Sequence, residues 1–306
     1  MTPPALVLVH GFGSSSDQWR RLVKSIQWKQ AYEPNGTLNG PRTIVAVDIL
    51  GFGNSEKPGV SYTQHLWEAQ IGDFVLEVLR GRPFVIAGNS IGGGLSCGVA
   101  SNLKDLCRGL ILCNTAGVIL EPSEYAAQAA ATGKSVGEQT RGGAAGLGVY
   151  YKGVPGGQAL LDGFGSGLIG LLKPQIPDLL KKCYPTNPDS ADSAQALHIA
   201  RGASDPGADN VIGSGQKLPP QRPLNEVLGA ACNQHPPISA FTGPVLVTQG
   251  VLDPLTGPEL AAQRAEQLGV LRDDVTVERL QAGHCPHDEL PDDVASAVVR
   301  WWPQVL

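Results

Sequence analysis

The sequence is poor in the features that mark nucleic-acid-binding and membrane-spanning proteins. Its 306 residues carry a net charge of −5, and lysine and arginine form no run, which argues against nucleic acid as the main partner. No segment approaches the roughly 18 consecutive apolar residues that a membrane-spanning helix needs. We therefore expect a soluble protein.

Signatures of metal and cofactor sites are missing as well. The six cysteines are scattered without a Cys-x-x-Cys pair, so we expect buried free thiols rather than a disulfide framework or a zinc site. Neither a G-x-x-x-x-G-K-[ST] phosphate loop nor the glycine spacing of a dinucleotide fingerprint occurs. His284 and His287 are close in sequence, but no second dense cluster of His, Asp or Glu completes a metal site. The sequence predicts no cofactor and no metal.

The chain does have enough hydrophobic residues to form a core, and its apolar runs follow a regular pattern. Hydrophobic residues make up 42% of the chain and charged residues 17%, which is typical of a globular protein. Short apolar runs alternate with helical patterns, and this predicts an α/β protein with a mostly parallel sheet flanked by helices. Strands are expected at 5–9, 43–48, 84–88, 109–113, 245–249 and 275–280. Helices are expected at 64–80, 92–104, 258–268 and 291–302.

The alternation stops after about residue 120 and resumes at 245. The intervening part is rich in glycine, includes the apolar segment 167–182, and has a helical pattern at about 189–202. We therefore predict an α/β core formed by residues 1–120 and 241–306, with residues 121–240 inserted as a cap or lid.

The strongest chemical signal is Gly88-Asn89-Ser90-Ile91-Gly92, a G-x-S-x-G sequence between an expected buried strand and an expected helix. A turn of this kind holds the serine in a strained conformation and exposes its Oγ, and the flanking glycines avoid clashes. Ser90 is therefore predicted to be a nucleophile. The alternative is a purely structural turn.

A serine nucleophile needs a base, and the base needs a carboxylate that orients it. Asp253 and His284 each follow an expected strand, so both belong at the carboxyl ends of the sheet, as Ser90 does. We predict a catalytic triad of these three residues. Asp48 stays a rival acid. His287 stays a rival base, with His284 favoured because it lies nearer the end of its strand.

The first strand runs directly into the sequence HGFG (10–13). Glycines let this loop approach a substrate, and a free N–H group there can stabilise an oxyanion together with the N–H after the nucleophile. We predict the N–H groups of Phe12 and Ile91 as the oxyanion hole. The glycine-bearing segment 48–58 is expected to be a tight structural turn beside the site.

These motifs together resemble the α/β-hydrolase superfamily over nearly the whole chain: HGFG, D-x-x-G-F-G-x-S (48–55), GNSIGG, and the late Asp and His. The strings GNSIGG, LDP and AGHCPHDELP further resemble plant and algal plastid members that include pheophytinase and chlorophyll dephytylase. The resemblance implies an α/β-hydrolase fold and a Ser90–Asp253–His284 esterase. It also implies cleavage of the phytyl ester of pheophytin or chlorophyll, and a chloroplast location.

The first part of the chain and the cap both depart from the superfamily pattern. Members usually have a β-hairpin ahead of the strand that leads to HGFG, whereas here that strand begins at about Ala5, so we expect the first edge hairpin to be absent. The cap decides the substrate, and we assign Asn89, Leu171 and Leu172 to substrate binding. The Leu- and Ile-rich segment 167–180 is expected to line an apolar slot, to contact a membrane surface peripherally, or simply to pack on the core.

Other activities fit the same motifs. One is a general carboxylesterase, and another is a carbon–carbon bond hydrolase of ring-cleavage products, which would use a cap arginine such as Arg141, Arg201 or Arg222 for a substrate carboxylate. A third is a receptor or pigment-assembly factor that keeps the hydrolase fold but turns over little, because fold alone does not decide function. Repeated turnover separates an enzyme from a receptor.

Overall fold

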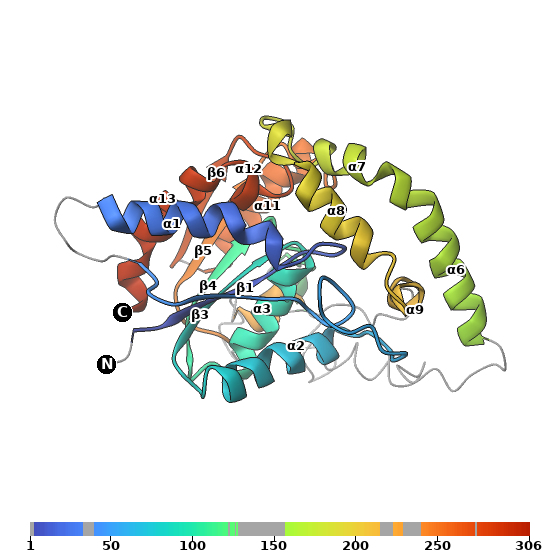
Figure 1. Cartoon of the computed structure of the whole chain (residues 1–306). Helices are drawn as coiled ribbons and strands as arrows, with labels where there is room; N and C mark the ends of the chain where they lie inside the picture. The colour runs from blue at the N-terminus through green and yellow to red at the C-terminus, as the bar shows by residue number, and fades with distance from the viewer. Residues whose placement is uncertain are drawn as a thin grey trace.

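The centre of the molecule is a parallel sheet with helices on both faces (Figure 1). The computed structural model describes residues 3–32, 40–121, 123–125, 127, 157–214, 223–228, 240–272 and 274–306. Its six strands lie in the order β2-β1-β3-β4-β5-β6, and every pair is parallel. They are β1 (Ala5–Val9), β2 (Ile44–Val47), β3 (Phe84–Asn89), β4 (Cys107–Cys113), β5 (Val245–Gly250) and β6 (Val275–Leu280). The predicted α/β fold and all of its expected strands are confirmed.

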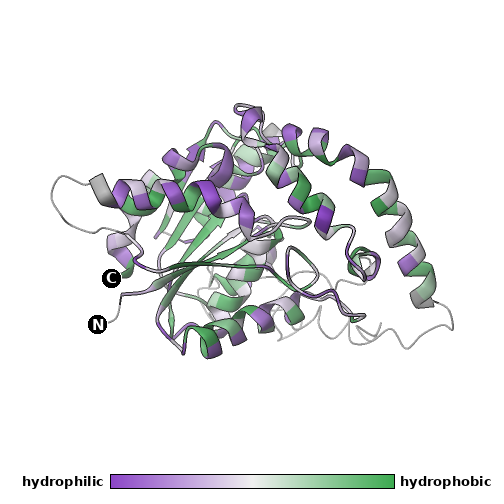
Figure 2. Cartoon of the chain, viewed as in Figure 1, coloured by the Kyte–Doolittle hydropathy of each residue, from purple (hydrophilic) through white to green (hydrophobic). Residues whose placement is uncertain are grey.

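Successive residues of the central strands enter opposite layers of the core. In β1, Val7 and Val9 pack into one hydrophobic cluster while Leu6 and Leu8 pack into the other. The strands are therefore apolar along their whole length because both faces are covered. Figure 2 shows them as a hydrophobic band between the helices.

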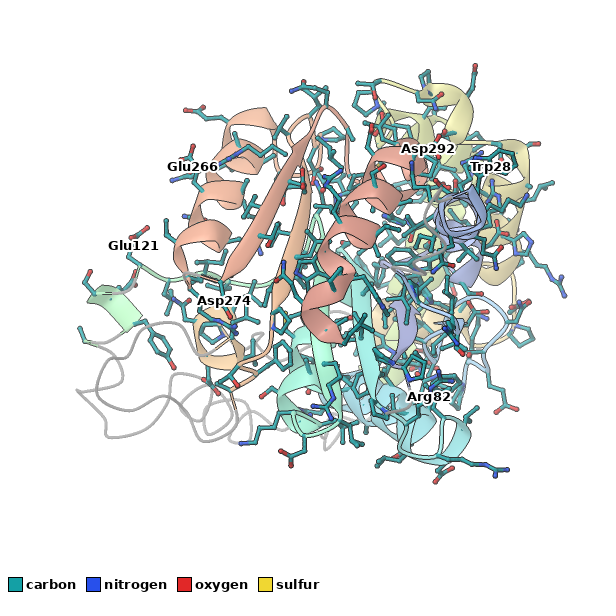
Figure 3. The ribbon with its side chains drawn as sticks, turned by 90° about the vertical axis from the view of Figure 1, so that its left-hand side faces the viewer. Trp28, Arg82, Glu121, Glu266, Asp274 and Asp292 are labelled. Carbon is teal, nitrogen blue, oxygen red and sulfur yellow. The ribbon has the colours of Figure 1, made fainter. Side chains whose placement is uncertain are left out.

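The helices divide between the two faces of the sheet. One cluster packs against η1 (Ser16–Trp19), α1 (Arg20–Tyr32), α13 (Pro291–Trp301) and η6 (Trp302–Val305). The other packs against α2 (Gln64–Asp73), η2 (Phe74–Val78), α3 (Ile91–Asn102) and α11 (Pro258–Val270). Figure 3 shows Trp28 of α1 and Asp292 of α13 at one end of the molecule and Arg82 at the other. Arg82 donates to the carbonyl of Pro3 and the hydroxyl of Thr43, so it holds together the chain just before β1 and β2.

Two helical expectations need correction. No helix is predicted between the first two strands, yet η1 and α1 lie there, with Trp19 of η1 and Leu22 and Ile26 of α1 buried. The short periodic pattern 19, 22, 26 is the signal that was available. The helix expected at 64–80 is α-helical only to Asp73 and continues as the π-helical turn η2.

A helical insertion lies between β4 and β5, as the interrupted pattern predicts (Figure 1). It contains α6 (Gly157–Leu172), η3 (Lys173–Gln175), α7 (Ile176–Lys182), η4 (Pro188–Ser190), α8 (Ser193–Gly202), α9 (Ala208–Ser214) and α10 (Leu224–Val227). Helices α6 and α9 cross closely. A side chain at Gly165 or Gly213 would clash with a backbone carbonyl of the other helix, so glycine at these positions permits the crossing. The glycine-rich stretch 128–156 lies outside the described residues. Among the helices of the described ranges, none is long and apolar enough to cross a bilayer.

Candidate active site

The predicted site lies where the strand order changes direction. The chain goes from β1 to β2 on one side of the sheet and then to β3 on the other side of β1. Loops that follow β1 and β3 therefore diverge and leave a crevice at the carboxyl end of the sheet. The HGFG loop (10–13) leaves β1 there, and Ser90 follows β3, with Val9 and Gly88 paired in register.

Ser90 occupies a strained turn between β3 and α3. Its φ of 55° and ψ of −122° lie in a region that L-residues rarely adopt. A side chain at Gly88 would clash with the backbone of Gly92, and one at Gly92 would clash with the carbonyls of Val9 and His10. Only glycine fits at both flanks, and this explains why G-x-S-x-G stands at this turn.

His284 and Asp253 form a hydrogen-bonded pair near the ends of β6 and β5. The distance from His284 Nδ1 to Asp253 Oδ2 is 2.8 Å, and Asp253 is 1% exposed. Burial opposes ionisation of this carboxyl group, but hydrogen bonds from His284, Asn114 and the N–H of Leu255 outweigh it and hold the pKa of Asp253 below its usual value. The carboxylate is thus in place to orient the imidazole.

Asp48, the rival acid, has another set of partners. Its Oδ1 accepts a hydrogen bond from the N–H of Ser16 at 2.6 Å, and its Oδ2 accepts one from the N–H of Asn54 at 2.9 Å. A side chain at Gly53, whose φ is 54°, would clash with the Asp48 carboxyl group. Asp48 therefore holds the 48–55 turn closed, as expected for a structural turn beside the site.

His287, the rival base, is enclosed in the core. It is 0% exposed, its ring lies 4.0 Å from the Trp19 ring between centroids, and within the described ranges neither ring nitrogen has a hydrogen-bond partner. Burial, together with the nearby His284, lowers the pKa of His287 to about 3. His287, Asp288 and Glu289 lie just before the helix predicted at 291–302 and form the separate one-turn helix α12 (Pro286–Glu289).

His287→Phe is expected to make folding less sensitive to acid. The unfolded imidazole takes up a proton below about pH 6.5, whereas the folded one does so only near pH 3, so stability falls as pH falls between these values. Between pH 7.5 and 4.5 this group alone costs about 2 to 3 kcal/mol. Urea unfolding at both pH values should show a smaller loss in His287→Phe than in the wild type. The exchange His198→Phe on an exposed helix surface is the control, and equal losses in His287→Phe and the wild type would contradict the prediction.

The HGFG loop is fixed by its buried histidine. His10 Nε2 accepts a hydrogen bond from the N–H of Ile49 at 3.1 Å, and its Nδ1 lies 2.8 Å from the carbonyl of Gly11. Burial lowers the pKa of His10, so the ring is neutral and bonds the backbone on both sides. The loop thereby brings Phe12 to the wall of the cavity that Ser90 also lines.

A cavity of about 640 Å³ joins the core residues to the cap. Its wall includes Phe12, Asn89, Ser90 and His284 from the core and mostly apolar side chains from the cap, among them Leu168, Ile169, Leu172, Ile176, Leu179 and Leu180. Leu171, which the sequence assigns to substrate binding with Leu172, lies outside this wall and is 63% exposed. Of the three cap arginines considered for a substrate carboxylate, Arg201 is exposed on α8, and Arg141 and Arg222 lie outside the described residues.

The cysteines of the described ranges are free thiols: Cys97, Cys107, Cys113, Cys183 and Cys285. Four of them are buried as expected, but Cys183 is only half-buried because it lines the cavity beside Cys285. Burial, with the nearby Asp253 and Glu289, raises the pKa of Cys183 to about 11, so its thiol is protonated at neutral pH and is a poor nucleophile. Cys232 lies outside the described residues.

Asn114 and Glu289, which were not predicted as site residues, help to orient the site. Asn89 has a structural role besides the predicted one. Asn114, directly after β4, donates to Asp253 Oδ2 at 2.9 Å, and Glu289 accepts from the N–H of Gly283, the residue before His284. Asn89, assigned to substrate binding, also donates from Nδ2 to the carbonyls of Cys113 and His284. The position of Asn114 at the end of a central strand was an available signal, whereas nothing local in the sequence singles out Glu289.

Curated relatives match part of the chain. A 2-hydroxy-6-oxo-6-(2'-aminophenyl)hexa-2,4-dienoic acid hydrolase of Metapseudomonas resinovorans is 29% identical over 122 residues, which are 39% of this chain and 38% of the relative. A 2-hydroxymuconate semialdehyde hydrolase of Pseudomonas putida is 37% identical over 117 residues, 38% of this chain and 37% of the relative. The matches thus span less than two-fifths of the relatives' own length.

The matches to solved structures and to a family model each cover nearly the whole chain. An esterase from Thermogutta terrifontis superposes with a TM-score of 0.62 at 17% identity, covering 99% of this chain and 91% of that one. A serine hydrolase involved in carbazole degradation superposes with a TM-score of 0.62 at 21% identity, covering 98% and 91%. The family model described as "Alpha/beta hydrolase family" matches residues 6–297. The chain therefore belongs to the α/β-hydrolase family.

Proposed function

We propose that this chain is a serine hydrolase that cleaves a carboxylic ester of a hydrophobic substrate. The observation that carries the proposal is the arrangement of Ser90 on its strained turn with the Asp253–His284 pair, because Ser90 and His284 line one cavity. A nucleophile, an oriented base and a largely apolar wall are what such a reaction requires.

The reaction follows from these positions. Ser90 Oγ attacks the ester carbonyl carbon while His284 takes its proton, and the N–H groups of Phe12 and Ile91 stabilise the oxyanion. The C–O bond to the alcohol then breaks, and His284 returns the proton to the leaving oxygen. Water, deprotonated by the same His284, attacks the acyl-enzyme, releases the acid and restores Ser90. The Asp253 carboxylate stabilises the imidazolium at both steps.

The identity of the substrate is a more specific question than the type of reaction. The relatives reported above are named for dienoic acid and semialdehyde substrates and not for chlorophyll-type pigments, so a general carboxylesterase or a carbon–carbon bond hydrolase is better supported than a pigment enzyme. A chlorophyll-type phytyl ester and a chloroplast location stay predictions from the sequence resemblance alone. The apolar cavity wall supports any ester with a hydrocarbon part.

Carbon–carbon bond hydrolysis is the second candidate. It is favoured by the sequence similarity to hydrolases named for dienoic acid and semialdehyde substrates. In such a reaction the bond that breaks joins the attacked carbonyl carbon to a neighbouring carbon, so the leaving group takes its proton on carbon rather than on oxygen. The cavity side chains Lys173 and His198 are available to contact a substrate carboxylate.

The boundaries 121–240 for the cap, and its contact with a membrane surface, also stay proposals. On α6 the side chains of Leu160, Phe164 and Leu171 are exposed and recur at the spacing of one helix face. Such a stripe favours contact with an apolar surface.

The proposed function is tested by labelling followed by turnover. A fluorophosphonate should label Ser90, and the chain should turn over p-nitrophenyl esters many times, which separates an enzyme from a receptor. Esters of increasing chain length, chlorophyll a and pheophytin a in detergent, and a ring-cleavage dienoate then discriminate the substrates, with released phytol measured by chromatography. Absence of both labelling and turnover on every substrate would refute the serine hydrolase.

Leu172→Ser is expected to weaken binding of long acyl or alkyl chains. Leu172 lines the cavity, so its loss should raise KM for a p-nitrophenyl octanoate about 3- to 10-fold and leave KM for the acetate nearly unchanged. Leu171→Ser is the matched control because the neighbouring side chain is exposed and lies outside the wall. Equal effects of the two variants, or equal effects on the two esters, would remove Leu172 from the substrate site.

A further inference from the structure

Two segments far apart in sequence meet beside His284, and we call them together the cap junction: residues 183–192 of the cap insertion and residues 283–289 around α12. The N–H of His284 donates to the carbonyl of Cys183 at 3.0 Å. A side chain at Gly283 would lie 2.2 Å from the same carbonyl, so the two backbones are in close contact. The cap therefore contacts the backbone of the proposed catalytic base directly.

The carboxyl group of Glu289 connects the two segments of the cap junction. Its Oε1 accepts hydrogen bonds from the N–H of Thr186 at 2.7 Å, from the Thr186 hydroxyl at 2.8 Å and from the N–H of Asn187 at 3.1 Å. Its Oε2 accepts the N–H of Gly283 at 2.6 Å. Glu289 is 0% exposed, so these four bonds form without competition from bulk water. Both oxygens act only as acceptors, which is the role of an ionised carboxylate.

These bonds determine where the His284 backbone lies. On one side the Gly283 peptide is bonded to Glu289 and the His284 N–H to Cys183. On the other side the His284 carbonyl accepts from Asn89, the residue before Ser90. A shift of the cap segment is thus passed through Glu289 to the residue before the base, while Asn89 keeps the other end tied to the nucleophile's turn.

Neighbouring contacts strengthen the cap junction without reaching His284. Asp288 accepts a hydrogen bond from the Tyr184 hydroxyl at 2.8 Å and pairs with Arg21 at 3.0 Å, and Arg21 also pairs with Asp192. These bonds fasten the cap to α1. Glu289 differs from these residues because it bonds both the cap and the N–H of Gly283, the residue before the base.

We propose that Glu289 is a positioning residue that couples the seating of the cap to the position of the His284 imidazole. It touches neither substrate nor reacting atoms and acts through the Gly283–His284 backbone. The inference rests on the proposed function, because it takes His284 as the base. It means that hydrolysis proceeds at full rate only while residues 183–187 are seated on α12, so the cap that forms the substrate cavity also completes the catalytic geometry.

Glu289→Gln is the first test. The amide has nearly the shape of the carboxyl group, but whichever way it is turned its NH₂ faces an N–H donor of either Gly283 or the cap. We expect kcat for p-nitrophenyl acetate to fall about 10- to 100-fold, because misplacing a catalytic group by about an ångström has an effect of this size. KM should stay within about threefold, and kcat for the octanoate should fall by the same factor. A residue that only supports the cap would instead raise KM, most of all for the octanoate.

Thr186→Val is a milder second variant, which removes the hydroxyl donor and keeps the backbone N–H. We expect a loss in kcat of about threefold in the wild-type background and no further loss in Glu289→Gln, because the two groups act through one bond network. Asp205→Asn is the matched control, since it breaks the cap's ion pair with Lys57 at another contact with the core. It should leave kcat for the acetate unchanged.

Amide hydrogen exchange of the full chain supplies a readout that needs no activity. The Gly283 and His284 amides should exchange faster in Glu289→Gln and Thr186→Val than in the wild type and the control. Unchanged exchange at both amides, or a folded Glu289→Gln with kcat within twofold of the wild type, overturns the coupling. If Glu289→Gln does not fold, Thr186→Val decides by the same criteria. A wild type that hydrolyses no ester refutes the proposed function instead, and the exchange result then decides the coupling.

Discussion

Replacing Ser90 by alanine is expected to lower kcat for p-nitrophenyl esters by about 10³-fold or more. The substitution removes the only atom that forms the acyl-enzyme in the proposed reaction, and leaves the cavity wall and the Asp253–His284 pair in place. Fluorophosphonate labelling should disappear together with turnover. Initial rates and the mass of the labelled protein are the measurements.

Ser96→Ala provides the matched control for this experiment. Ser96 is a buried serine of α3 whose hydroxyl donates to the carbonyl of Gly92, so its loss affects packing and not the proposed chemistry. It should keep labelling and most of kcat. Near-normal hydrolysis by a folded Ser90→Ala protein would show that the whole site has been assigned wrongly.

Asp253→Asn is expected to be nearly as severe, with kcat lowered about 10³-fold or more. The amide cannot stabilise an imidazolium, and its NH₂ can hold His284 in the wrong tautomer. In addition, Asp253 accepts hydrogen bonds from Asn114 and from the N–H of Leu255 on its two oxygens, so an NH₂ on either side faces a donor. Steady-state kinetics of the folded variant would measure the loss.

Asp48→Asn makes the same chemical change in the rival acid, whose side chain is half-buried. Because the Asp48 carboxyl group accepts from backbone N–H groups of Ser16 and Asn54, this variant should lose stability while keeping kcat within a few-fold. Thermal unfolding and kinetics of both variants separate the two roles. A folded Asp48→Asn protein with the greater loss in kcat would transfer the acid's role to Asp48.

Elements whose cause is local could be predicted from the sequence. The central strands β1 and β3 are buried along their whole length and are almost entirely apolar, and the turn at Ser90 needs glycine at positions 88 and 92 because backbone atoms approach there. Asp253 and His284 were identified because each follows an expected strand, although their roles are still predictions. Chain order and strand ends carry this information without any knowledge of the packing.

What escaped prediction depends on contacts between distant parts of the chain. Glu289 bonds residues more than 100 positions earlier in sequence, and no periodicity marks such a partner. Leu171 and Leu172 could not be distinguished because α6 is apolar around most of its circumference, so the pattern does not show which face meets the cavity. The close crossing with α9 at Gly165 shows that orientation in the structure.

The strained backbone conformation of Ser90 bears on which residue type suits position 90. A non-glycine residue with φ of 55° and ψ of −122° costs about 1 to 3 kcal/mol, a sizeable part of the margin by which a domain stays folded. Selection for stability alone favours glycine at position 90, since glycine adopts this conformation with little strain. A serine at this position therefore lowers the stability of the fold, which is the relation expected of a residue that serves chemistry rather than packing.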